Sequence, residues 1–135
     1  MAWTLSTAVS HTLDFGVIQR KLEHALAKSE RPDADIALRF VSHDESRTLN
    51  VHYRKKDAPG NVLSFPVQDV PEGEHLLGDV FIAYPILRTG FADKLSDEDI
   101  AVSLAVHGFL HLLGFDHQDD ASSEEMDRLH ESLVS

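Results

Sequence analysis

The chain has 135 residues, a formal net charge of −11 and no cysteine. This length fits one domain, and a composition with 42% hydrophobic and 26% charged residues is typical of a globular protein rather than a disordered polymer. The lack of cysteine excludes disulfide scaffolds, iron–sulfur clusters and thiolate zinc fingers. We therefore expect a single domain over residues 1–135, in which any metal is held by His and carboxylate side chains.

The hydrophobic runs of the chain are too short for a membrane protein. The N-terminal segment lacks the basic stretch and the sustained apolar stretch of a signal peptide. The longest uncharged run, Ile100–Phe115, falls short of the roughly 18 apolar residues that span a bilayer, and two His interrupt it. We expect a cytoplasmic protein with no membrane partner.

Apolar spacing predicts two helices in the first half of the chain, over Gly16–Lys28 with Asp14 as N-cap and over Asp44–Arg54. Between them, Asp35–Val41 alternates apolar and polar residues and is predicted to be a strand. The inner face of the first helix is expected to carry Val17, Leu22, Ala25 and Leu26.

The second half is predicted to contain two short strands and two helices. The strands cover Asn61–Val67 and Leu77–Ala83, and Pro66 indicates that the first of them lies at a sheet edge or ends early. A helix over Ser96–Leu113, with Ser96 as N-cap, is apolar nearly all round and is expected to be buried. A last helix over Ser122–Leu133 is amphipathic. Because helices and strands do not strictly alternate, we expect an α/β (α+β) domain with a small mixed β-sheet packed around the buried central helix.

His107 and His111 lie four residues apart in this central helix, so they share one helical face and are close enough to bind one ion. Gly114 is expected to end the helix in the left-handed conformation and to return His117 to the same point. With nine His in the chain, chance would produce this spacing only ~0.04 times. Three neutral nitrogen ligands leave one tetrahedral position of zinc open, as a catalytic site requires. The central helix is therefore predicted to bind one Zn²⁺ ion, with another divalent transition metal as the alternative.

The spacing of the three His also matches the metzincin peptidases, whose pattern has a Glu directly after the first His. In this chain the corresponding residue is Gly108, which cannot act as a base. Asp116 could replace that base, but a role beside the ligand His117 is equally compatible with its position. Peptide hydrolysis is disfavoured and stays an alternative, as does another metallohydrolase activity.

Three segments together resemble the YbeY family of bacterial rRNA maturation factors, namely HGFLHLLGFDH at His107–His117, YRKKDAPGNVLSFP at Tyr53–Pro66 and LGDVFIA at Leu77–Ala83. Members of this family are single-domain, metal-dependent endoribonucleases of rRNA processing and ribosome quality control. The resemblance implies that the three His bind zinc and that Arg54 contacts the RNA phosphate near the metal. It also implies a preference for single-stranded RNA, with rRNA precursors and the ribosome as partners, a ribosomal or assembly protein as a further candidate, and no DNA.

Two positions depart from the family pattern. Gly60 and Asn61 stand where Thr-Asp is common, and Ser103 stands where the family has a His one turn before the first ligand. Neither change affects the predicted ligands. The chemistry also supports Arg54 independently, because a guanidinium fork matches the negative charge that develops during phosphodiester cleavage. The basic run formed with Lys55 and Lys56 would equally suit a helix C-terminus.

The charge is unevenly distributed along the chain. Residues 1–56 carry 9 basic and 7 acidic side chains, whereas residues 57–135 carry 3 and 16. An acidic protein of this kind is expected to bind free RNA weakly and in a salt-sensitive way.

A ribosome-assembly binding protein with a purely structural metal is the remaining alternative. Asp79 is expected to be structural, and the other His are expected at the surface: His11, His24, His43, His52, His75 and His130.

Overall fold

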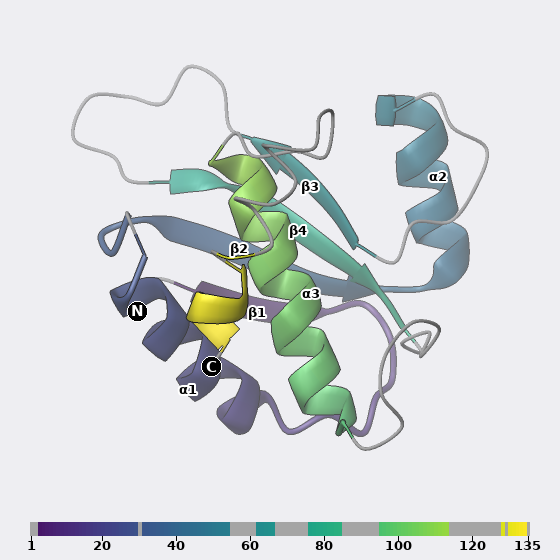
Figure 1. Ribbon diagram of the computed structural model, residues 1–135. Coiled ribbons are helices and arrows are strands. Elements are labelled where there is room, and N and C mark those ends of the chain that lie inside the picture. Colours follow the sequence, from purple (N-terminus) through teal and green to yellow (C-terminus); the bar gives the residue numbers. More distant parts are fainter. Residues whose placement is uncertain are drawn as a thin grey trace.

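The computed structural model describes residues 3–29, 31–54, 62–66, 76–84, 95–113, 128 and 130–134. The elements follow one another as β1 (Trp3–Thr7), α1 (Phe15–Ala27), β2 (Asp35–Val41), α2 (His43–Arg54), β3 (Val62–Pro66), β4 (Leu76–Ala83) and α3 (Asp97–Leu112). Residues 130–134 form a last helical turn. The mixed α/β class predicted from the sequence is confirmed (Figure 1).

The four strands form one mixed sheet in the order β1-β2-β4-β3. The pairs β1–β2 and β2–β4 are parallel, and β3 pairs antiparallel with β4 at the edge of the sheet. Pro66, which cannot donate a ladder hydrogen bond, ends this edge strand as expected. Figure 1 shows α1 and α3 side by side on the same face of the sheet.

The core lies between this sheet face and the two helices. Alternate residues of β2, namely Ile36, Leu38 and Phe40, are buried as predicted. From Ile100 to Leu112, α3 is buried over most of its surface, as its apolar sequence predicted. It needs no amphipathic face because the sheet, α1 and the last helical turn cover it on several sides.

Two features of the first quarter of the chain differ from the expectations. The segment Trp3–Thr7 forms β1, which pairs in parallel with β2 over Ile36–Phe40. Five residues give too weak an alternation to predict a strand whose partner is about thirty residues away in the chain. In α1 the buried position is Ile18 rather than Val17, because Ile18 is the residue one turn before Leu22.

The last predicted helix lies only partly within the described residues, as residue 128 and residues 130–134, where Leu133 is buried. Among the helices of the described ranges, none is both long and apolar enough to cross a membrane.

Candidate metal centre

The helix that carries the candidate ligands is fixed at its start by its own sequence. The Ser96 hydroxyl accepts a hydrogen bond from the Asp99 backbone N–H at 3.1 Å and caps α3. Three acidic residues in the first turn, Asp97, Glu98 and Asp99, interact favourably with the positive end of the helix dipole. These signals set where α3 begins.

His107 and His111 lie together on α3, as their spacing predicted. Their Nε2 atoms are 3.0 Å apart, and their ring centroids are 4.6 Å apart with the planes inclined by 76°. Two nitrogen ligands of a tetrahedral zinc ion would be separated by about 3.3 Å, given Zn–N bonds of about 2.05 Å. Both imidazoles are half-buried. The pair therefore fits two ligands of one Zn²⁺ ion with only a small rotation of the rings.

Gly108 faces the sheet, on a different side of α3 from the two His. A Cβ atom at this position would lie 2.8 Å from Val80 Cγ1 and 3.3 Å from Val62 Cγ2. The side chain of Val80 is branched at Cβ and has little freedom to move away. A Glu at position 108 would therefore be directed into the sheet rather than toward the His pair, so the peptidase pattern fails here by geometry as well as by residue type.

The remaining predicted site residues lie at the limits of the described chain. His117, Gly114 and Asp116 lie outside the described residues. Arg54 is the last residue of α2, and its side chain lies outside the described part, as do Lys55 and Lys56. Within the described ranges, no three His, Asp or Glu side chains form a group that could hold a metal ion. The described portion of the predicted centre is therefore the pair His107 and His111.

His130 joins this region, although it was expected at the surface. It is half-buried, and its Nε2 lies 2.9 Å from the backbone oxygen of Ser103 and 3.1 Å from the Ser103 hydroxyl. Its ring centroid is 6.3 Å from that of His107. The contact spans 27 residues, so no local spacing could have indicated it. The last helical turn is thereby attached to α3 one turn before the first candidate ligand.

Three other His had the same expectation. His24 is exposed as predicted, whereas His11 and His43 are half-buried. His11 stacks on Phe15 with ring centroids 4.4 Å apart, a contact in which the imidazole covers an aromatic side chain of α1. His52 and His75 lie outside the residues whose side chains are described.

Asp79 does not belong to the His cluster. On β4 its neighbours Gly78 and Val80 are buried, and Val80 contacts α3, so the alternation of the strand turns Asp79 to the opposite face of the sheet. Burial there raises the pKa of its carboxyl group above the ordinary value. This position is consistent with the structural role expected for Asp79.

Comparison with known proteins agrees with this fold. The family model described as Endoribonuclease YbeY matches residues 6–135. A Stenotrophomonas maltophilia protein of that name is 39% identical over 147 residues, covering 97% of this chain and 88% of that protein. One from Xanthomonas euvesicatoria pv. vesicatoria is 40% identical over 144 residues with the same coverage. The solution structure of a Thermotoga maritima protein is 27% identical, with a TM-score of 0.61 over 98% of this chain and 86% of that one.

The family model and the sequence relatives are named for endoribonuclease activity, and the Thermotoga maritima structure shares the mixed α/β fold of this chain. The chain belongs to the Endoribonuclease YbeY family, as the resemblance of its motifs implied.

Proposed function

We propose that this protein is a metal-dependent endoribonuclease that hydrolyses phosphodiester bonds of single-stranded RNA in rRNA maturation and ribosome quality control. Family membership supports the activity. The structural observation that carries the proposal is the convergence of the His107 and His111 Nε2 atoms to 3.0 Å on a buried, capped helix. His117 is proposed as the third ligand and Zn²⁺ as the ion.

The bound metal would supply one part of the chemistry, and the protein's own groups would have two tasks. A zinc ion bound at the His site would supply Lewis-acid chemistry toward a phosphoryl oxygen of the RNA. Helix α3 holds the two Nε2 atoms in place, because Ser96 fixes its start and Gly108 allows it to pack closely on Val80. Arg54 is proposed to bind the phosphate that is cleaved, where its guanidinium would stabilise the negative charge that develops.

The alternative activities receive less support. A peptidase of the related spacing needs a base at position 108, and here that position packs against the sheet. An assembly factor with a structural metal would have a closed coordination sphere with a fourth protein ligand. The peptidase would differ from the proposed enzyme in its substrate. The assembly factor would differ because it cleaves no RNA and so needs no metal for turnover.

The test is cleavage of a single-stranded rRNA fragment and of an unrelated peptide library, in parallel, before and after removal of metal with a chelator. We expect internal cleavage of the RNA only, loss of cleavage after chelation, and recovery when Zn²⁺ or another divalent transition metal is added back. Cleavage of peptides without cleavage of RNA, or RNA cleavage that chelation does not alter, would contradict the proposal.

A further inference from the structure

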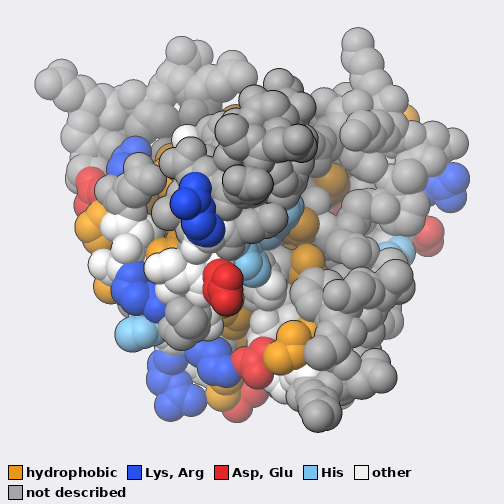
Figure 2. Space-filling view, viewed as in Figure 1, with side chains coloured by type: hydrophobic (Ala, Val, Ile, Leu, Met, Phe, Trp, Pro, Cys, Tyr) orange, Lys and Arg blue, Asp and Glu red, His pale blue; other side chains and the backbone are white. Residues whose placement is uncertain are grey.

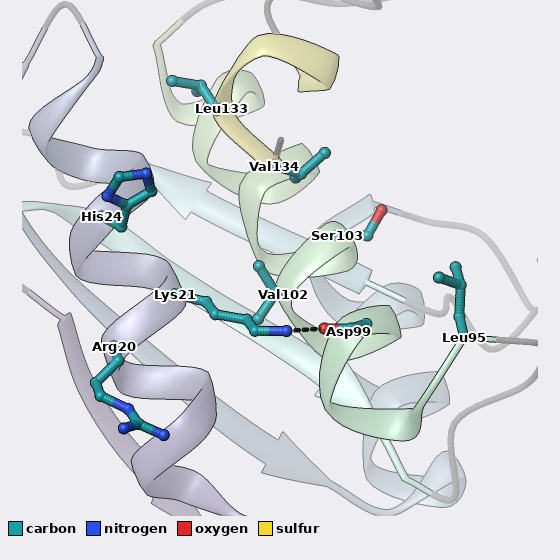
Figure 3. A pocket seen from close by; sticks show the side chains of 9 residues that line it. All are labelled: Arg20, Lys21, His24, Leu95, Asp99, Val102, Ser103, Leu133 and Val134. Carbon is teal, nitrogen blue, oxygen red and sulfur yellow. Dashed lines mark hydrogen bonds and ion pairs between the residues drawn. The ribbon is translucent and has the colours of Figure 1, made fainter.

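A cavity of about 560 Å³ lies between α1, the first half of α3 and the last helical turn (Figure 3). Its volume falls within the range of about 300–1,000 Å³ that is usual for ligand sites. Arg20, Lys21 and His24 line the α1 side. The opposite side is largely apolar and consists of Leu95, Val102, Leu133 and Val134.

The cavity ends at Ser103, one helical turn before the first candidate ligand His107. Asp99 and Ser103 line it, and Ser103, His107 and His111 follow at steps of four residues, so all four side chains lie along one strip of α3. Two steps of four residues, from Asp99 to His107, advance about 12 Å along a helix, a length that about two nucleotides of a single strand can span. His130 is hydrogen-bonded to Ser103 and in ring contact with His107, so it lies between the end of the cavity and the His pair.

The α1 side of the cavity is basic in a protein of net charge −11. Figure 2 shows Lys and Arg side chains gathered over α1, with His side chains in the middle of the same face. The one carboxylate of α1, Glu23, accepts a hydrogen bond from the Trp3 backbone N–H at 3.1 Å. A cluster of cations beside apolar surface suits a nucleotide, because phosphate binds to the cations and the base packs on apolar groups.

Arg20 and Lys21 differ in how far their charge is already neutralised by a carboxylate. Lys21 extends from α1 to form an ion pair with Asp99 on α3, as Figure 3 shows. The hydrogen bond from Lys21 holds the pKa of Asp99 below its ordinary value, so this carboxylate is ionised at neutral pH and offsets the Lys21 charge. Arg20 makes no ion pair within the described part of the chain and is exposed.

We propose that this cavity binds a nucleotide of a single-stranded RNA substrate about two nucleotides away from the scissile phosphodiester, with Arg20 as its main phosphate contact. The proposal rests on the proposed function, since it assigns a second subsite to the same RNA. Lys21 is the weaker contact because Asp99 competes with the phosphate for it. The apolar wall formed by Val102, Leu133 and Val134 receives the base without reading its sequence.

The test is binding of a fluorescent single-stranded RNA oligonucleotide to the full chain, measured by anisotropy over a series of salt concentrations with chelator present to keep the RNA intact. Arg20→Ala is expected to weaken binding about tenfold at low salt and to lower the slope of log K against log salt by about 0.7, the value for one lost phosphate contact on a single strand. Asp99→Asn is expected to tighten binding several-fold and to steepen the slope, because it releases Lys21. Arg39→Ala removes another exposed cation, on β2, whose side chain donates a hydrogen bond to the Ser6 hydroxyl, and should leave binding unchanged.

Thermal unfolding of each variant should be measured first, to check that the fold is intact before binding is compared. The proposal is overturned if Arg20→Ala binds RNA as the wild type does, or if Asp99→Asn binds it no more tightly. Either result would leave RNA cleavage by the wild-type protein standing, so it would be distinct from failure of the proposed function. Binding of an acidic peptide at the cavity in place of RNA, detected by the same Arg20→Ala comparison, would also overturn it.

Discussion

Asp79 carries a burial cost that the rest of β4 does not share. It is half-buried on the sheet face opposite α3, and desolvation raises the pKa of its carboxyl group above 3.8. A raised carboxyl pKa in the folded state means that the unfolded chain loses the proton first as pH rises. The stability associated with protonated Asp79 is thus present below about pH 3.8 and is lost as pH rises through the folded-state pKa.

Replacement of Asp79 by Asn should therefore raise the free energy of unfolding at pH 7, because the amide carries no charge to desolvate. The gain should shrink as pH falls and vanish below about pH 3.8, where the wild-type carboxyl is protonated in both states. Urea unfolding of both proteins between pH 3 and pH 8 measures this difference. A variant that is less stable than the wild type at pH 7 would show that the Asp79 carboxylate has a stabilising partner instead.

Substitution of Arg54 tests its proposed role in binding the phosphate that is cleaved. It is the last residue of α2, and charge reversal by Arg54→Glu should leave the metal content unchanged, because Arg is not a metal ligand. Cleavage of single-stranded RNA should fall at least about 10²-fold in kcat/KM, the usual effect of removing one group that stabilises transition-state charge. Arg47→Glu, seven residues earlier on the same helix and exposed, is the matched control for charge. Equal loss of activity in the two variants would remove the specific role of Arg54.

At the scale of elements, Gly108 explains how α3 lies so close to the sheet. A Cβ at this position would approach Val80 Cγ1 to 2.8 Å, so Gly108→Ala should force α3 away from β4. Overpacking of this kind costs typically about 1–3 kcal/mol. The higher helix propensity of Ala offsets about 1 kcal/mol of that cost. We expect a net loss of up to about 2 kcal/mol in the free energy of unfolding.

Gly16→Ala is the matched control, because Gly16 is also helical but is exposed, and the nearest atom to its added Cβ is Asp14 Oδ1 at 3.3 Å. This variant should be at least as stable as the wild type, by up to about 1 kcal/mol, because Ala has the higher helix propensity and is not overpacked there. Chemical denaturation of the three proteins decides the matter, and a Gly108→Ala protein as stable as Gly16→Ala would contradict the close packing of α3 on β4.

The elements that could be predicted from the sequence are those with strong local signals. The alternation over Asp35–Val41, the capping residues Asp14 and Ser96, and the breaking effect of Pro66 each act within a few residues, and each agrees with the structure. The strand β1 depends instead on parallel pairing with β2, which follows α1 in the chain. No short segment of sequence contains that information.

The same distinction holds for the candidate site. The spacing of His107 and His111 follows from helix geometry and could be predicted, and the structure brings the two side chains together. The contact of His130 with Ser103 and the cavity between α1 and α3 arise from packing of distant segments, so sequence spacing does not reveal them. Whether position 108 points toward the sheet or toward the His pair likewise becomes known only once α3 is placed on the sheet.

For the whole molecule, the net charge of −11 is compatible with an RNA substrate because the cations are concentrated where contact is proposed. The basic side of the cavity on α1 and the run that begins at Arg54 both belong to residues 1–56, where basic side chains outnumber acidic ones by 9 to 7. Long-range repulsion by the remaining carboxylates should keep binding to free RNA weak and strongly salt-dependent.

The central claim is that a metal ion held by the His site is required for RNA cleavage. Its most direct test is the metal content per chain of the purified His111→Ala protein, measured by mass spectrometry together with cleavage of single-stranded RNA, with His43→Ala as the control. The account predicts loss of both metal and cleavage in His111→Ala, with both retained in His43→Ala, because removal of one of three ligands sharply lowers metal affinity. Stoichiometric metal with undiminished cleavage in His111→Ala would contradict it.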